Sequence, residues 1–344
     1  MVERADYAQA VAAQPENLEL AQRSLSVALE GRQLPRWKPG QTVGIVAMGA
    51  STHSANALVY ALGCSGIRAV NLTASDLDLF PAEFQPADHY VIVSESGRSP
   101  EPISAARRLT PGRRVVITNF PSSPVAEVVD YVLPLGGFLD SGVYTIGYTS
   151  TLLAYALLLE SAGVSGWAPD AAGVADRVRE AIAAYGEAAN RVAAIIESVA
   201  AVDFVGRGMS YAAAAEGALV FRESLGLPTA AFETYQYLHG PMEGSRRGTA
   251  LVVFGDDREL TLIDSVLDAG VKVILVTTAD ASELTAPEHE NLTVFRLPDS
   301  TTGFARAIVE ILIVQLIAGG VSQRLGRPIG DFTYRQGDTK LPLD

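Results

Sequence analysis

The stretch that decides the fold is VGIVAMGASTHSANAL, which covers residues 43–58. Its apolar start leads into a turn at Gly49 and then into a helix-length segment. A second stretch, VDFVGRGMSYAAAAEG at residues 202–217, repeats this order and aligns Gly208 with Gly49 and Ser210 with Ser51. Self-similarity of this kind indicates that one strand, turn and helix unit occurs twice in the chain.

Three further apolar segments follow in each copy at matching separations. They pair residues 89–102 with 250–261, residues 113–120 with 271–280, and residues 131–137 with 293–299. These strands lack polar alternation, and helix-length segments separate them, which is typical of parallel strands covered on both faces. The sequence therefore predicts a duplicated α/β architecture.

The domain organisation follows from this duplication. We expect an N-terminal helical arm at 1–35, a first domain at 36–165, a linker helix within 166–200, a second domain at 201–326 and a C-terminal tail at 327–344. Apolar residues spaced by three and four predict one long helix over 170–200. Residues 145–159 read as a buried helix, because the run is interrupted by polar residues and is shorter than the ~20 residues that span a bilayer. The tail is rich in Gly, Pro and Asp, so we expect no regular structure there.

Composition limits the class of protein and its partners. The chain has 344 residues and a formal net charge of −13, which disfavours binding to nucleic acid and to anionic membrane surfaces. Its single cysteine, Cys64, excludes an internal disulfide and a multi-cysteine metal site, and we expect it in the core. The four histidines have no paired ligand spacing, so we predict no metal. Because no N-terminal signal pattern is present, we expect a cytoplasmic protein.

A serine-rich segment, VIVSESGRSPEP at residues 91–102, follows one apolar strand. Ligands of doubly wound sheets bind beyond the carboxyl ends of the strands, and hydroxyls with free backbone N–H groups suit a phosphate monoester. Ser99 before Pro100 predicts a helix that begins there. Alternatively, the serines only satisfy turn and cap hydrogen bonds. The second copy has FGDDRE in this place, so the fold does not require hydroxyls there.

The second copy carries its own polar residues. An apolar helix at residues 211–228 contains Glu216 and Glu223, and His239 precedes a Gly-Pro turn. These side chains are either solvated, salt-bridged or capping groups, or they perform acid and base chemistry.

The motifs SESGRSPE, AEGALVFRE and YLHGP, in this order and with the duplication, resemble the double sugar isomerase (SIS) family. This family includes the isomerase half of glucosamine-6-phosphate synthase, amino-sugar-phosphate deaminases and fructosamine-6-phosphate deglycases. The resemblance covers the chain from about residue 20 to the tail. It implies two tandem SIS domains, each a flavodoxin-like doubly wound parallel sheet flanked by helices.

The resemblance also implies roles for individual residues. Glu223 would be the base that moves a proton between C1 and C2, and Glu216 matches the first glutamate of the same motif. His239, from the neighbouring subunit of a homodimer, would assist ring opening, and Lys340 would close over the sugar. The substrate and phosphate site would comprise Gly49, Ser51, Ser94, Glu95, Ser96, Gly97 and Ser99. No cofactor is implied.

Departures from the family pattern affect the expected reaction. Glu95 stands where relatives commonly have glutamine, arginine or histidine. Its negative charge would repel a phosphate, so either a cation such as Arg98 compensates that charge or Glu95 binds an ammonium on the substrate. Val220 replaces a lysine, and Met1 replaces the cysteine of a glutamine-hydrolysing domain. We therefore predict an amino-sugar or ketosamine phosphate isomerase that releases an amine or ammonia without glutaminase activity. The alternatives are a simple aldose-ketose phosphate isomerase and a non-catalytic sugar-phosphate sensor.

Overall fold

The computed structural model describes residues 4–32, 34–334 and 336–342. The chain divides into two compact units. The N-terminal unit comprises Ala13–Leu139, Ile146–Ala175 and Phe332–Asp344, and the C-terminal unit comprises Met1–Ala12, Asp140–Thr145 and Asp176–Asp331. The predicted N-terminal arm and the predicted tail therefore each contribute residues to both units.

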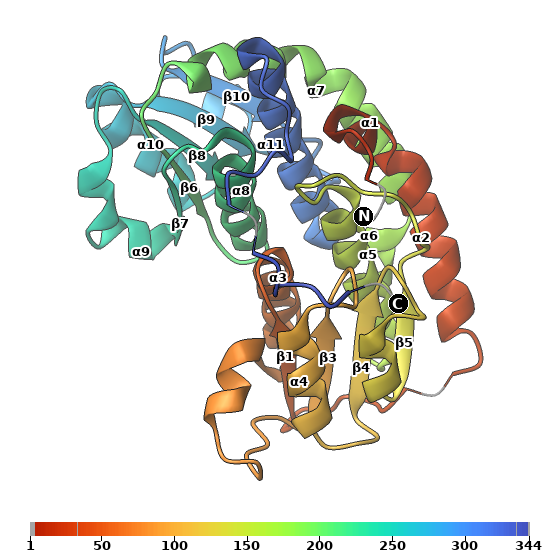
Figure 1. The fold of residues 1–344 in the computed structure, drawn as a ribbon. Helices are drawn as coiled ribbons and strands as arrows, with labels where there is room; N and C mark the ends of the chain where they lie inside the picture. The colour runs from red at the N-terminus through yellow and green to blue at the C-terminus, as the bar shows by residue number, and fades with distance from the viewer. Residues whose placement is uncertain (1–3, 33, 335, 343–344) are drawn as a thin grey trace. The chain divides into compact units, whose positions relative to one another are not determined.

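A five-stranded parallel sheet forms the centre of the N-terminal unit, in the order β2-β1-β3-β4-β5 (Figure 1). This is the flavodoxin-like order, in which the chain reverses direction across the sheet between β1 and β3. The strands are β1 (Thr42–Ala47), β2 (Arg68–Thr73), β3 (His89–Val93), β4 (Arg114–Thr118) and β5 (Tyr131–Pro134).

Helices connect these strands and cover the sheet. The α-helices of the N-terminal unit are α2 (Gln14–Leu29), α3 (Ala50–Cys64), α4 (Pro100–Arg108), α5 (Ile146–Ser161) and α6 (Ala168–Ala171), with short 3₁₀ helices η1 (Ala74–Leu79) and η2 (Pro124–Val128). Helix α5 is buried along nearly its whole length and packs against α2 and α3. The prediction of a buried helix in this segment is confirmed.

The C-terminal unit repeats the same topology. Its sheet has the order β10-β9-β8-β6-β7, which is the flavodoxin-like order read from the opposite edge. The strands are β6 (Val202–Gly206), β7 (Thr229–Glu233), β8 (Ala250–Phe254), β9 (Lys272–Thr277) and β10 (Leu292–Arg296). The helices are α1 (Tyr7–Ala12), α7 (Val174–Glu197), α8 (Ser210–Leu225), α9 (Thr234–Leu238), α10 (Arg258–Asp268) and α11 (Gly303–Leu325), with η3 (Pro241–Gly244) and η4 (Ala281–Glu283).

Helix α11 belongs to the core of the C-terminal unit, where it packs on α8 and α1. Among the described residues it is the one helix with the length and apolar composition of a membrane span, yet 83% of its apolar window is buried inside the protein. It ends at Gly326, whose φ of 60° is the left-handed conformation that glycine adopts readily. The burial of most of the apolar window of α11 is typical of a core helix.

The predicted α/β fold with two parallel sheets is confirmed, but the sequence analysis missed two strands. Strands β2 and β7 lie at positions where the chain is only partly buried, so neither shows an apolar run. The expected place of Cys64 is also wrong, because its side chain is exposed. The buried face of α3 ends with Ala61 and Leu62, and Cys64 falls outside it.

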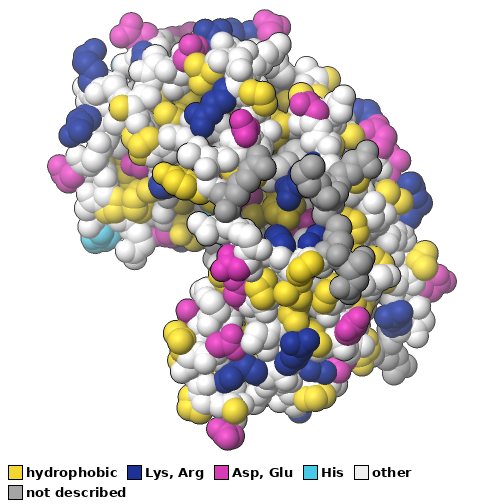
Figure 2. Space-filling view, viewed as in Figure 1, with side chains coloured by type: hydrophobic (Ala, Val, Ile, Leu, Met, Phe, Trp, Pro, Cys, Tyr) yellow, Lys and Arg dark blue, Asp and Glu magenta, His cyan; other side chains and the backbone are white. Residues whose placement is uncertain are grey.

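Charged side chains of both signs are distributed over the face drawn in Figure 2. Acidic and basic groups are interspersed on this face. The face drawn in Figure 2 shows no continuous stripe of basic side chains among the described residues.

Candidate active site

The serine loop, residues 94–99, connects β3 to α4 at the carboxyl edge of the N-terminal sheet. The N–H of Gly97 donates to the carbonyl oxygen of Ser94 at 3.0 Å, which closes the turn. Gly97 has a φ of 62°, and a Cβ added there would lie 1.8 Å from Oγ of Ser123. Only glycine fits this position, so the loop conformation depends on Gly97.

The hydroxyls of this loop are not used to cap the helix that follows. Ser99 is the N-cap residue of α4, as predicted, but its side chain makes no capping bond to the described part of that helix. The side chain of Ser94 is buried, and its Oγ has no hydrogen-bond partner among the described residues. A buried hydroxyl without a partner is uncommon, because leaving it unpaired costs about 1–3 kcal/mol. The loop therefore contains a hydroxyl whose hydrogen-bonding capacity the described protein atoms do not satisfy.

Lys340 from the C-terminal tail contacts two of these serines. Its Nζ donates to Oγ of Ser99 at 2.8 Å and to Oγ of Ser96 at 3.0 Å. All these residues belong to the N-terminal unit. The structure thus brings an ammonium group and the hydroxyl-bearing loop together at one end of one sheet.

Glu95 points its carboxylate at the end of the neighbouring strand, β4. Its Oε1 accepts from Nδ2 of Asn119 at 2.9 Å. Its backbone carbonyl accepts from the N–H of Asn119 at 2.8 Å and from Oγ1 of Thr118 at 3.1 Å. Asn119 also donates to the carbonyl of Phe138 and accepts from the N–H of Gly137, so it is firmly placed. These contacts anchor Glu95 to the loop framework.

Gly49 and Ser51 lie at the neighbouring turn, between β1 and α3. Strands β1 and β3 are adjacent and parallel, so their carboxyl ends share one edge of the sheet. Gly49 has a φ of 55° and is the N-cap residue of α3, and Ser51 is partly buried in the first turn of that helix. The turn therefore borders the serine loop at the point where the strand order reverses.

The two glutamates on α8, in the C-terminal unit, have different environments. Glu216 is buried, with 1% of its surface exposed, and its charge contributes, after burial and Asp140, to raising the pKa of the buried Tyr7. Glu223 lies in the last turn before Gly226 and is exposed within the described chain. A buried carboxylate suits a structural role, whereas an exposed one can meet a substrate.

His239 follows α9 in the same unit and is exposed. It precedes Gly240, which has a φ of 140°, and a 3₁₀ turn that begins at Pro241. The side chain is therefore neither a core residue nor buried in a cap. It remains accessible to a partner or a ligand.

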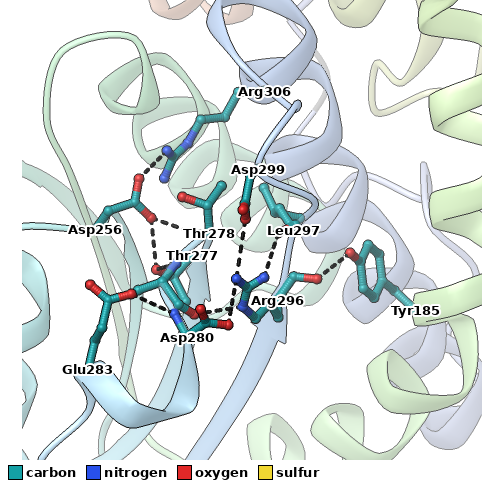
Figure 3. A network of polar contacts seen from close by, with 11 residues as sticks. Tyr185, Asp256, Thr277, Thr278, Asp280, Glu283, Arg296, Leu297, Asp299 and Arg306 are labelled. Atoms are coloured by element: carbon teal, nitrogen blue, oxygen red, sulfur yellow. Dashed lines mark hydrogen bonds and ion pairs between the residues drawn. The ribbon is translucent and has the colours of Figure 1, made fainter.

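The carboxyl edge of the C-terminal sheet contains an ion network in place of a hydroxyl loop (Figure 3). Asp256 accepts from Oγ1 of Thr277 at 2.8 Å and from the N–H of Thr278 at 2.7 Å, and it pairs with Arg306. Arg306 also donates through Nε to Oε1 of Glu310 at 2.8 Å. Ser210, the counterpart of Ser51, donates to the same Glu310 oxygen at 2.8 Å.

The protonation of this network follows from its contacts. Burial alone would raise the pKa of Asp256, but hydrogen bonds from Arg306, Thr278 and Thr277 outweigh it and lower the pKa to about 2. Burial raises the pKa of the Glu310 carboxyl, and its Oε2 has no partner among the described residues. Charged side chains of the protein itself thus occupy the place where the other unit presents serines.

Sequence reasoning missed the residues that hold the serine loop in place. Asn119 and Thr118 anchor Glu95, and Arg98 contacts the tail. For Asn119 a signal was present, since it directly follows an apolar strand whose carboxyl end lies beside the loop. No sequence signal connects Arg98 with the tail, because 243 residues separate the partners.

Comparison with known proteins agrees with this architecture. Residues 195–321 match the family model described as SIS domain. Residues 195–321, which lie within the C-terminal unit, are therefore similar to a SIS domain. Over a longer range, glutamine-fructose-6-phosphate aminotransferase (isomerizing) of Bradyrhizobium diazoefficiens is 24% identical over 346 residues, covering 92% of this chain and 56% of the relative. The chain spans 39% to 56% of the length of the curated relatives that it matches.

Solved structures extend the likeness to both units of the chain. The C-terminal domain of glucosamine-fructose-6-phosphate aminotransferase from Francisella tularensis aligns with a TM-score of 0.77 at 19% identity, covering 94% of this chain and 97% of that one. A glucosamine-6-phosphate deaminase from Thermotoga maritima aligns with a TM-score of 0.75 at 16% identity, covering 96% and 98%. At these identities the likeness establishes the fold.

Proposed function

We propose that this protein is a sugar-phosphate isomerase that acts on an amino-sugar or ketosamine phosphate and releases ammonia or an amine. The observation that carries the proposal is the group of donors at the carboxyl edge of the N-terminal sheet. The Ser94 hydroxyl, which has no hydrogen-bond partner within the described part of the chain, lies in the same loop as Ser96 and Ser99, which bind the ammonium of Lys340. Hydroxyls and a cation next to the start of a helix suit a phosphate group.

In this proposal both units are SIS domains with different tasks. The N-terminal unit repeats the strand order of the matched unit and binds the phosphate end of the sugar. The contrast between the serine loop and the ion network around Asp256 supports one anion site, in the N-terminal unit only. The relatives and neighbours named above include proteins that act on hexose and hexosamine phosphates, which supports this substrate class.

Glu223 is the base in the proposed reaction. It removes a proton from the carbon next to a carbonyl or iminium and returns it to the neighbouring carbon, so that C1 and C2 exchange oxidation level. The carbon that bears nitrogen becomes an imine; water adds to its C=N bond, and the C–N bond then breaks to leave a carbonyl and free ammonia or amine.

The oxygen charge that develops at C1 or C2 has to be neutralised by a hydrogen-bond donor near these carbons. Lys340, which contacts Ser96 and Ser99, is assigned to the phosphate end in this proposal. His239, from a second copy of the chain in a homodimer, assists ring opening. In this proposal Glu216 does not contact the substrate, because only 1% of its surface is exposed.

Solvent deuterium exchange tests the role of Glu223. The wild-type chain, incubated in D₂O with hexosamine 6-phosphates and with fructosamine 6-phosphates, should incorporate deuterium at C1 or C2 of one of them. Glu223→Gln should abolish incorporation and leave binding of inorganic phosphate unchanged. Glu187→Gln is the matched control, since the Glu187 side chain is 90% exposed on α7. Exchange that persists in Glu223→Gln removes this residue from the mechanism.

The same incubations distinguish the alternative functions. Free ammonia or amine in the product mixture supports deamination or deglycation. Deuterium exchange with no nitrogen release identifies a simple aldose-ketose isomerase. Binding of sugar phosphates with no exchange by the wild-type chain identifies a non-catalytic sensor and contradicts the proposal.

A further inference from the structure

The C-terminal tail contacts the serine loop through two residues that exchange backbone and side-chain hydrogen bonds. The N–H of Leu341 donates to the carbonyl oxygen of Arg98 at 2.9 Å. In return, Nε of Arg98 donates to the carbonyl oxygen of Leu341 at 2.8 Å, and Nη2 donates to the same oxygen. The Leu341 side chain also packs against the hydrophobic core cluster of the N-terminal unit. The tail is therefore held at this residue by three kinds of contact.

This contact determines where the preceding residue, Lys340, can lie. Its ammonium is within hydrogen-bond distance of Ser96 and Ser99, directly before the first turn of α4. The N-terminal end of a helix carries a partial positive charge, which disfavours a cation there. A phosphate is attracted by the ammonium, by the serine O–H donors and by the helix end alike.

Arg98 itself does not supply that cation. Its place inside the serine loop would allow direct contact with a phosphate, but both of its side-chain hydrogen bonds given above go to the carbonyl oxygen of Leu341. A guanidinium that binds one carbonyl oxygen through two N–H groups is fixed in orientation. The guanidinium of Arg98 is thus bound to the C-terminal tail at Leu341.

We propose that Arg98 is a positioning residue, which docks the tail so that Lys340 becomes the cation of the phosphate site. The inference rests on the proposed function, because it takes the serine loop as the phosphate site. Docking of the tail and binding of the anion are then coupled, and each strengthens the other by the same factor. A sugar without a phosphate gains nothing from this coupling, so the tail determines the preference for phosphorylated substrates.

Titration with inorganic phosphate and hydrogen exchange test this inference on the full chain. The variants are Arg98→Met, Arg98→Lys, Lys340→Met and the double variant Arg98→Met/Lys340→Met. Arg107→Met is the matched control, because Arg107 lies on the same helix, α4, and is exposed. Calorimetry gives the Kd for phosphate, and mass spectrometry gives the exchange rate of the peptide that contains Leu341.

The expected results separate positioning from direct binding. Lys340→Met should raise the Kd for phosphate by about ten- to a hundredfold, the size expected for a lost hydrogen bond to a charged group. Arg98→Met should raise the Kd to a similar extent, and the double variant should be no weaker than the weaker single variant, because both changes remove one interaction. Arg98→Lys should restore part of the affinity. Arg98→Met should also speed exchange at Leu341 when no phosphate is present, whereas Arg107→Met should not.

Three outcomes would overturn the inference. Wild-type affinity for phosphate in Arg98→Met would show that Arg98 does not position the cation. Effects of Arg98→Met and Lys340→Met that multiply in the double variant would show that each group binds phosphate independently. A wild-type chain that binds no phosphate would remove the anion site and the proposed function with it. A chain that binds phosphate as expected but fails the deuterium test would lose the proposed reaction while keeping this inference.

Discussion

Glu95 and Asp256 hold equivalent places in the two sheets. Each is the second residue after the third strand of its unit, β3 or β8, and each is bound by the end of the next strand. Asn119 N–H and Thr118 Oγ1 donate to Glu95, and Thr278 N–H and Thr277 Oγ1 donate to Asp256. The donors correspond one to one, but in Glu95 they meet the backbone carbonyl and in Asp256 the side chain. The side chain of Asp256 therefore takes the two donors that the backbone carbonyl of Glu95 takes in the N-terminal unit.

The charge of Glu95 should weaken phosphate binding. Glu95→Gln keeps an oxygen that can accept from Asn119 Nδ2 and removes one negative charge from the serine loop. We expect the Kd for inorganic phosphate to fall by about three- to tenfold at low ionic strength, and by less at high salt. Calorimetry at two salt concentrations measures both values, with the exposed Glu83→Gln as control.

The same variant also tests whether Glu95 recognises an amine. If the carboxylate binds an ammonium on the substrate, Glu95→Gln should weaken binding of an amino-sugar phosphate even while it strengthens binding of inorganic phosphate. An unchanged or higher Kd for inorganic phosphate would contradict the electrostatic argument.

Asp256 should make the C-terminal unit sensitive to acid. Its pKa of about 2 in the folded state lies below the value of about 3.9 for an unfolded chain, so its contribution to stability is complete above about pH 4 and is lost as the pH falls toward 2. The shift corresponds to about 2 kcal/mol. Thermal unfolding at pH 5 and pH 3 should therefore differ less in Asp256→Asn than in the wild type.

A neighbouring residue provides the control for this pH dependence. Asp257 is exposed and makes no side-chain capping bond to the described part of α10. Asp257→Asn should leave the difference between pH 5 and pH 3 as in the wild type. If Asp256→Asn retained the full wild-type difference, the pairing of Asp256 with Arg306 would not be the source of the acid sensitivity.

The buried ion network should depend strongly on Arg306. Arg306→Met leaves Asp256 without its cation and Glu310, which is fully buried, without its charged partner. Breaking a buried pair in this way costs about 3–5 kcal/mol. Arg324→Met removes an exposed pair with Glu197 and should cost at most about 1 kcal/mol. Urea unfolding of the two variants measures the difference.

A compensated variant separates charge burial from packing. Replacing both carboxylates in the Arg306→Met background, as Asp256→Asn with Glu310→Gln, removes the uncompensated charges and should recover much of the lost stability. Equal stability of Arg306→Met with and without these changes would mean that the arginine stabilises the unit through its packing.

Apolar strands, the serine loop and the start of α4 were predictable because local sequence determines them. An apolar run such as VVIT before Asn119 is stable as a buried parallel strand, because both of its faces are then covered. Strands β2 and β7 were not predicted, because most of their side chains are only partly buried and such positions accept both polar and apolar residues. The docking of Leu341 on Arg98 could not be predicted either, since it depends on contacts between segments at opposite ends of the sequence.

Gly97 should be the residue on which the serine loop is most dependent. In Gly97→Ala the new methyl group would lie 1.8 Å from Oγ of Ser123 in a backbone with a φ of 62°. Gly112→Ala is the matched control, because Gly112 also has a positive φ, of 83°, but its Cβ would meet nothing within 4 Å. Backbone strain of about 1–3 kcal/mol is common to both variants, so the clash with Ser123 accounts for any additional loss of stability. Urea unfolding should show that additional loss in Gly97→Ala, and calorimetry should show that its phosphate binding is lost while Gly112→Ala binds as the wild type. Equal stability and equal phosphate affinity of the two variants would mean that the loop can rearrange around a side chain at position 97, and that its hydroxyls do not depend on this turn for their placement.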